Sequence, residues 1–168
     1  MKAALRQARE KLKRVTPMKG DCGRVCGARC CAPMEGEETG MLLFPGEEGA
    51  YADKDGWTIR ETAAGPMVIC PGECAREERP LACRMFPLVP EIREDGSVRA
   101  VTDLRAKAVC PLARQGKSAM DPAFIEAVRE AGERLARDEE QAAFLRALAT
   151  EQAEIRELRQ KLGGGADV

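Results

Sequence analysis

The sequence contains no histidine, and this absence excludes several kinds of active site. A Ser-His-Asp triad and a zinc hydrolase held by imidazole groups both require that residue. A cysteine nucleophile would therefore need a lysine or a carboxylate as its base. The chain also has no C-x-x-C redox pair, no Walker loop and no G-x-S-x-G motif. The acidic residues show no spacing that defines a catalytic pair, and we expect Glu37-Glu38 and Glu47-Glu48 to lie in solvated loops.

Aromatic residues and long apolar runs are also scarce. Aromatic residues make up 4% of the 168 residues, so we expect one domain with a modest core. The basic N-terminus lacks the apolar stretch of a signal peptide, and no run approaches the ~20 residues that span a bilayer. The net charge of −1 creates no overall field that favours nucleic acid. We therefore expect a cytoplasmic protein that binds neither a membrane nor nucleic acid.

What the chain does contain is eight cysteines, and they are clustered. Four fall within ten residues as C-x3-C-x3-C-C, two more form C-x3-C, and two stand singly. Clustered thiols in a reducing cytosol usually hold metal. A disulfide framework is the main alternative, but the missing export signal, the chain length and the adjacent cysteine pair argue against it. We predict that the metal ligands are Cys22, Cys26, Cys30, Cys31, Cys70, Cys74, Cys83 and Cys110.

Thiolates are soft ligands, so they favour zinc or an iron–sulfur cluster over magnesium or calcium. Both kinds of centre take four cysteines, so eight match either two four-thiolate sites or one site with additional reactive thiols. Because neighbouring side chains point apart, Cys30 and Cys31 can serve two different centres. A four-thiolate centre carries a net charge near −2, which attracts cations. Arginines close to the cysteines in sequence either meet this need or lie on the surface: Arg24, Arg29 and Arg84.

Four regions follow one another along the chain. Residues 1–17 have one apolar stripe and predict a helix, and its excess of basic residues indicates either a solvated face or a contact with an anionic partner. Residues 20–117 contain all the cysteines and are expected to form the metal-binding region. Residues 118–162 predict a pair of helices, and residues 163–168 a disordered tail.

Turn and capping signals place the elements within these regions. Residues 41–44, 57–60 and 66–70 are expected to pair as a hairpin or a meander, and Asp95-Gly96 predicts another hairpin between 88–93 and 98–102. The cysteines then fall at turns and strand ends. In the helical region, Asp121-Pro122 and Asp138 mark two helix starts. The second helix carries an apolar stripe that indicates either packing on the metal region or a coiled-coil partner: Leu145, Leu148, Ile155, Leu158 and Leu162.

The order of these motifs resembles a known family. The cysteine run at 22–31 ends in adjacent cysteines, and an apolar segment with acidic residues follows at 40–48. The signature R-P-L-A-C-R-M-F-P occupies 79–87, and Cys110-Pro111 completes the pattern. Over about residues 20–115 these motifs resemble the CxxCxxCC family of YkgJ-type cysteine cluster proteins, although the first run is spaced more widely than the family name implies. The resemblance implies a zinc- or iron-chelating domain. Some relatives resemble flagellin lysine methylases, but this chain has no glycine-rich S-adenosylmethionine motif.

The sequence thus predicts an α+β fold: a small cysteine-rich core of loops and short hairpins, flanked by an N-terminal helix and a C-terminal helical pair. The expected function is metal-ion binding through the clustered cysteines, as zinc or as an iron–sulfur cluster. The alternative is an iron–sulfur-dependent redox enzyme or subunit that acts with a partner protein. No catalytic constellation is recognisable, so a binding module without turnover is favoured. The oligomeric state, the substrate and the pathway stay open.

Overall fold

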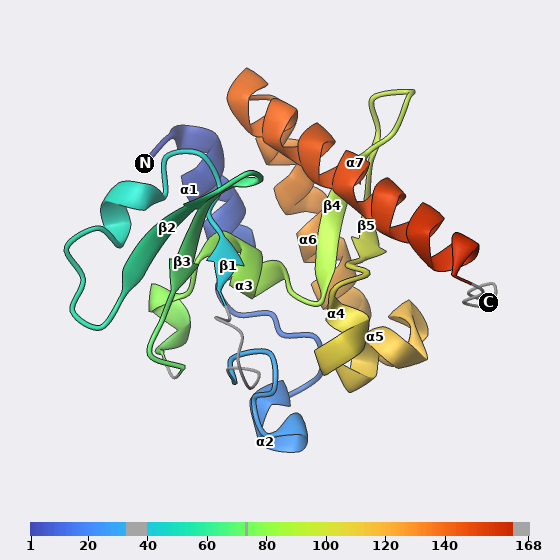
Figure 1. Ribbon diagram of the computed structural model, residues 1–168, viewed down its shortest axis with the longest axis horizontal. Helices are drawn as coiled ribbons and strands as arrows, with labels where there is room; N and C mark the ends of the chain where they lie inside the picture. Colours follow the sequence, from blue (N-terminus) through green and yellow to red (C-terminus); the bar gives the residue numbers. More distant parts are fainter. Residues whose placement is uncertain (33–39, 73, 163–168) are drawn as a thin grey trace.

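The computed structural model describes residues 1–32, 40–72 and 74–162. It shows the α+β fold that the sequence predicts, with an N-terminal helix, two small antiparallel sheets and two long C-terminal helices (Figure 1). Within these residues no helix is both long enough and apolar enough to cross a membrane. The expected tail at 163–168 and the pair Glu37-Glu38 lie outside the described residues.

The N-terminal helix α1 spans Ala3–Lys11 and is shorter than the sequence predicts. Its apolar stripe is confirmed, because Leu5, Ala8 and Leu12 are fully buried. The helix packs chiefly against α6 (Pro122–Leu135), far away in the sequence. The N-terminal segment therefore belongs to the main core of the protein.

The first sheet has three strands in the order β1-β3-β2. The strands are β1 (Met41–Leu42), β2 (Thr58–Thr62) and β3 (Gly65–Ile69), and all pairs are antiparallel. A two-residue turn joins β2 to β3, so the hairpin expected from the sequence is confirmed. The short 3-10 helix η1 (Glu48–Ala50) lies between β1 and β2.

The second sheet is the hairpin of β4 (Leu88–Ile92) and β5 (Val98–Thr102). The Asp-Gly turn is confirmed: Gly96 has a φ of 80°, and the Asp95 carboxylate accepts from the Ser97 backbone N–H. Two short helices precede the hairpin, η2 (Arg76–Glu78) and α3 (Leu81–Met85). Helix α6 packs against both strands, and α7 (Glu139–Lys161) packs against β4.

Short helices connect the second hairpin to the long ones. They are α4 (Ala106–Val109), α5 (Pro111–Gln115) and η3 (Lys117–Ala119). Both predicted helix starts are confirmed, because the Asp121 side chain accepts from Ala123 N and the Asp138 side chain from Gln141 N. The stripe of α7 is buried at Leu145 and Leu148, whereas Leu158 is 58% and Leu162 is 85% exposed. The expected apolar contact thus stops where α7 extends beyond the rest of the molecule (Figure 1).

The buried apolar side chains form two hydrophobic clusters. The larger cluster joins α1, α3, the second hairpin, α6 and α7. The smaller cluster contains Leu43, Tyr51, Trp57 and Val68, and it belongs to the three-stranded sheet and the chain around η1. Cys70 and Cys74 pack against this smaller cluster. Cysteines therefore lie beside the smaller cluster and also in α3, which contributes to the larger cluster.

Candidate functional site

The first four cysteines lie on a short helix and the turn that follows it. Helix α2 spans Cys22–Cys26, and the Asp21 carboxylate caps it by accepting from Gly23 N. Gly27 ends the helix with a φ of 64°, a left-handed conformation that glycine adopts without strain. The chain then turns back, so that the sulfurs of Cys30 and Cys31 lie 3.9 Å apart.

The other four cysteines come from three more segments. Cys70 directly follows β3 and Cys74 lies in the loop before η2, as expected for turns and strand ends. Cys83 instead lies inside α3, and Cys110 lies between α4 and α5. The expectation that the cysteines avoid helices is therefore wrong for Cys83, as it is for the two cysteines of α2. Helices of five residues still allow this, because each presents only one or two sulfurs to the site.

All eight cysteines line two adjoining cavities. The larger cavity, of about 460 Å³, is lined by Cys22, Cys26, Cys30, Cys83 and Cys110. The smaller, of about 60 Å³, is lined by Cys30, Cys31, Cys70, Cys74 and Cys83. Cys30 and Cys83 thus line both cavities. No cysteine of the chain lies elsewhere, although the sequence separates the first from the last by almost ninety positions.

The sulfurs surround these cavities without closing on a point. Among the residues that the structure describes, no group of three or more Cys, Asp or Glu side chains is close enough to hold a metal ion. All eight cysteines are free thiols, and none is paired in a disulfide. The structure thus brings the predicted ligands into one region, and it does not show a metal-binding group.

The environment of the thiols shifts their acidity. Burial is the main cause that raises the pKa of Cys22, Cys74 and Cys83, and nearby cysteines raise it further. The hydrogen bond within the Cys30–Cys31 pair raises the pKa of Cys30 and lowers that of Cys31. Several thiols in one partly buried region resist ionisation together, so a cation is needed to hold them as thiolates.

One cation already lies among the cysteines. Arg79 lines both cavities, and its charge lowers the pKa of Cys22, Cys31 and Cys74 against the effect of burial. The Nε atom of Arg79 is buried and has no hydrogen-bond partner. Arg79 is the first residue of the signature at 79–87, but it lies four residues or more from every cysteine, so proximity in sequence did not select it as a partner of the thiolates.

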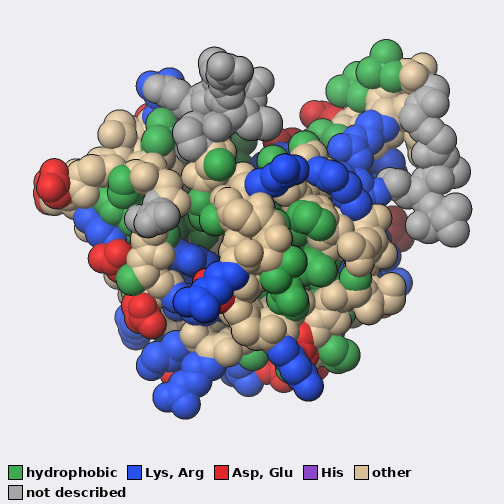
Figure 2. Space-filling view, turned by 90° about the horizontal axis from the view of Figure 1, so that it is seen from below, with side chains coloured by type: hydrophobic (Ala, Val, Ile, Leu, Met, Phe, Trp, Pro, Cys, Tyr) green, Lys and Arg blue, Asp and Glu red, His purple; other side chains and the backbone are tan. Residues whose placement is uncertain are grey.

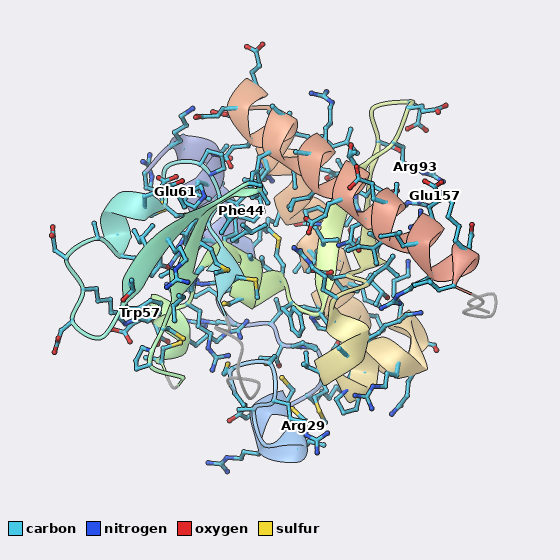
Figure 3. The ribbon with its side chains drawn as sticks, in the orientation of Figure 1. Arg29, Phe44, Trp57, Glu61, Arg93 and Glu157 are labelled. Atoms are coloured by element: carbon cyan, nitrogen blue, oxygen red, sulfur yellow. The ribbon has the colours of Figure 1, made fainter. Side chains whose placement is uncertain are left out.

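Three arginines close to the cysteines in sequence are either exposed or bonded to backbone carbonyl oxygens. The Arg24 side chain is 89% exposed, and Arg29 is exposed beside α2 at the lower edge of Figure 3. Arg84 is buried, but its guanidinium donates to the carbonyl oxygens of Arg9, Glu77 and Arg79. The expectation that one of these three compensates the thiolates is therefore not supported by their positions. Figure 2 shows this side of the molecule, where hydrophobic side chains lie between arginines and lysines.

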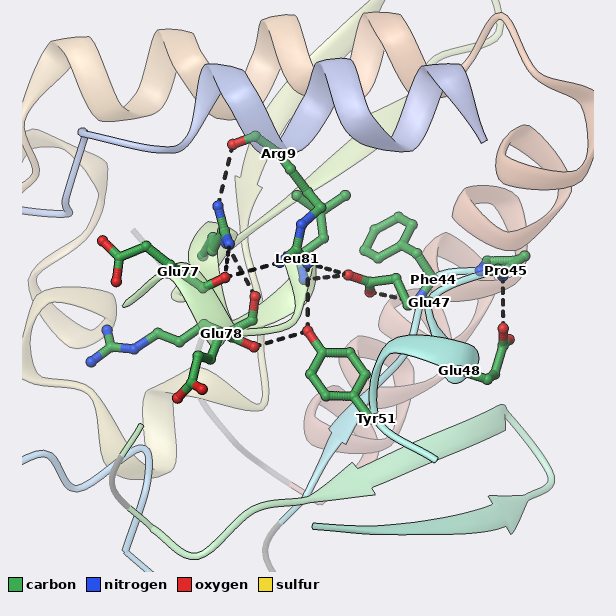
Figure 4. Close-up of polar contacts among 12 residues, drawn as sticks. Arg9, Phe44, Pro45, Glu47, Glu48, Tyr51, Glu77, Glu78 and Leu81 are labelled. Carbon is green, nitrogen blue, oxygen red and sulfur yellow. Dashed lines mark hydrogen bonds and ion pairs between the residues drawn. The ribbon is translucent and has the colours of Figure 1, made fainter. Parts of the chain in front are cut away.

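A buried carboxylate supports the segment that carries Cys83. Glu47 is 1% exposed, so the expectation that it lies in a solvated loop is wrong. Its side chain accepts from the backbone N–H of Phe44 and of Leu81, the first residue of α3 (Figure 4). Arg9 of α1 pairs with the same carboxylate at 2.6 Å. Glu47 thus connects α1, the chain after β1 and α3.

The comparisons with known proteins add no assignment. No family model, no curated protein and no solved structure matches the chain. The candidate site is therefore argued from its own residues.

Proposed function

We propose that this protein binds a thiophilic metal centre through two sets of four cysteines. The first set is Cys22, Cys26, Cys30 and Cys110, and the second is Cys31, Cys70, Cys74 and Cys83. The observation that carries the proposal is that all eight cysteines, from distant segments, line two adjoining cavities. Four cysteines are the number that structural zinc and iron–sulfur clusters both take.

The two cysteines that line both cavities are assigned by their neighbours. Apart from Cys31, the cysteines whose charges act on Cys30 are Cys22 and Cys26. The cysteines whose charges act on Cys83 are Cys31, Cys74 and Cys70. We assign Cys30 to the first set and Cys83 to the second, and the sulfur of Cys30 also lies 3.9 Å from that of Cys31. This division places the adjacent Cys30 and Cys31 in different sets.

The donor set suits either zinc or an iron–sulfur cluster, and these two groups require different distances between the cysteine sulfurs. Four thiolates on one zinc ion lie about 3.8 Å from one another, given bonds of about 2.3 Å in a tetrahedron. No three of the described cysteines are gathered closely enough to hold an ion. A cluster places iron and inorganic sulfide between the cysteine sulfurs, so it suits sulfurs that surround a cavity. When bound, such a group supplies either structural cross-linking or electron transfer.

The test is metal analysis of the protein purified without oxygen, together with a visible absorption spectrum of the same sample. Iron and sulfide in stoichiometric amounts in a brown protein support the cluster. A colourless protein that contains two zinc ions supports two four-cysteine sites that each bind zinc instead of a cluster. Protein that takes up neither iron nor zinc, even after reconstitution from the reduced state, overturns the proposal.

Two matched variants test the division into sets. Cys110→Ser is expected to empty the first set alone, and Cys74→Ser the second alone, so each loses about half of the bound metal. The variant with both changes is expected to lose all of it. If either single change removes all the metal, the eight cysteines hold one centre and the division is wrong.

One feature supports the alternative of a redox enzyme or subunit. The larger cavity has about 460 Å³ beside the first set, and apolar side chains of Phe86, Val109 and Leu112 help to line it. Cavities of this size accommodate small organic ligands. A reversible one-electron spectral change on titration with dithionite would favour this alternative. A centre that stays unchanged throughout the titration would favour a structural role.

A further inference from the structure

Arg79 occupies a position that no other described cation shares. It is the one arginine or lysine that lines both cavities. Its neighbours include Cys22 of the first set and Cys31, Cys74 and Cys83 of the second. The guanidinium therefore lies where the two sets meet.

The other arginines of the larger cavity are already engaged. Arg76 donates to the carbonyl oxygens of Leu12, Lys13 and Val15, and so ties the end of α1 to η2. Arg84 donates to three backbone carbonyl oxygens in the same way. Arg79 differs from both, because its buried Nε–H has no acceptor. A buried donor without an acceptor is unfavourable, so this atom indicates a missing partner.

We propose that Arg79 is the positioning residue shared by both cysteine sets, and that its Nε–H donates to a metal-bound thiolate. This inference rests on the proposed function. Each four-thiolate centre carries a net charge near −2, whether it holds zinc or an oxidised four-iron cluster. Two such centres side by side repel each other, and a guanidinium between them offsets part of that charge. Hydrogen bonds to the sulfurs also stabilise the thiolate form of the ligands.

The chemistry of the guanidinium explains why arginine suits this place. Its donors lie in one plane and point in several fixed directions, so one side chain can serve sulfurs on both sides. A lysine at the same position supplies the charge, but it has a methylene carbon where arginine has Nε, so it cannot donate from that place. Arg79→Lys therefore separates the charge from the hydrogen bond, and Arg79→Gln removes the charge.

The experiment measures zinc affinity of the full chain by competition with a chromophoric chelator. Arg79→Gln is expected to weaken binding by about 10- to 100-fold, as loss of a partner of metal ligands typically does. Arg79→Lys should recover part of this loss. Arg24→Gln is the matched control, because it removes one positive charge between Cys22 and Cys26 from an exposed side chain. The zinc affinity of this variant should stay within about twofold of that of the unchanged protein.

A spectroscopic measurement distinguishes a hydrogen bond from general support of the fold. With cobalt(II) as the probe, the sulfur-to-metal charge-transfer band should move to lower energy in Arg79→Lys, which has no donor at the Nε position, because a thiolate without its hydrogen bond gives up electron density more easily. The band should not move in Arg24→Gln. If Arg79→Gln does not fold, the decision rests on the band of Arg79→Lys.

The outcomes separate this inference from the proposed function. If the unchanged protein binds no metal, the proposed function is wrong, and so is the assignment of Arg79 to a metal-bound thiolate. If the unchanged protein binds metal and the Arg79 variants match Arg24→Gln in affinity and in band position, the proposed function stands and the inference about Arg79 is wrong.

Discussion

At the scale of single residues, the most consequential side chain outside the cysteines is Glu47. Burial raises the pKa of this carboxyl group, and the N–H donors of Leu81 and Phe44 and the charge of Arg9 oppose that shift. Tyr51 extends the same network by donating to the carbonyl oxygen of Glu78. A buried carboxylate with this many donors is a structural junction, and it holds α3, which carries Cys83, against α1.

We expect Glu47→Ala to lower the free energy of unfolding by about 3 kcal/mol, because it leaves two buried N–H groups and the Arg9 guanidinium without their acceptor. Urea unfolding of the metal-free protein measures the change. Glu48→Ala is the matched control at the next position, where the carboxylate accepts from an exposed Gly46 N–H, and it should change stability by about 0.5 kcal/mol or less. Equal stability of the two variants would show that Glu47 is not a junction.

At the scale of elements, the contact of α6 with the second hairpin depends on one glycine. Gly132 lies inside α6, where helix propensity alone disfavours glycine by about 1 kcal/mol relative to alanine. A Cβ atom built at this position would lie 2.4 Å from Pro90 Cβ and 2.7 Å from Val98 Cγ1. Glycine therefore allows the helix to approach both strands.

Gly132→Ala is expected to destabilise the protein by about 1–3 kcal/mol, the usual effect of overpacking, in spite of the gain in helix propensity. Thermal unfolding followed by circular dichroism at the helix signal measures it. Gly49→Ala is the control, because a Cβ there meets open space in the short helix η1. A stabilised Gly132→Ala protein would mean that α6 and the hairpin are not in this close contact.

Some elements could be predicted from the sequence because their signals act over a few residues. The turn at Asp95-Gly96 and the caps at Asp121 and Asp138 are such signals, and each is confirmed in atomic detail. The apolar stripe of α7 predicted which face of the helix is buried, but it did not predict how far along the helix the burial extends. Periodicity shows which face of a helix is apolar, but not where the partner surface ends, and Leu158 lies beyond that end.

At the scale of the whole molecule, the cysteine run at 22–31 has little apolar support. None of residues 18–32 is buried, and none belongs to either hydrophobic cluster. The long helices and the second hairpin, in contrast, share the larger cluster. If the proposed metal binding is correct, the order of this run comes from the metal, because metal binding adds directly to the stability of the segments it joins.

Removal of the metal by a strong chelator should therefore loosen the molecule unevenly. Hydrogen exchange read by mass spectrometry is expected to rise several-fold at residues 21–31 and at 106–111, and to change little in α6. Addition of metal should restore the protection. Equal exchange at 21–31 with and without metal would contradict the proposal, and so would a rise of the same size throughout α6.

The sequence by itself determined the kind of site that is open to this protein and most of its local structure. The absence of histidine excludes imidazole as a ligand or a base, and short-range turn and capping signals place the hairpins and the long helices. Only the tertiary structure decided that the cysteines line two cavities, that Arg79 rather than Arg24 lies among them, and that Glu47 is buried. The reason is physical: these relations join segments that are distant in the chain, and they depend on how the helices and sheets pack, which no local pattern specifies.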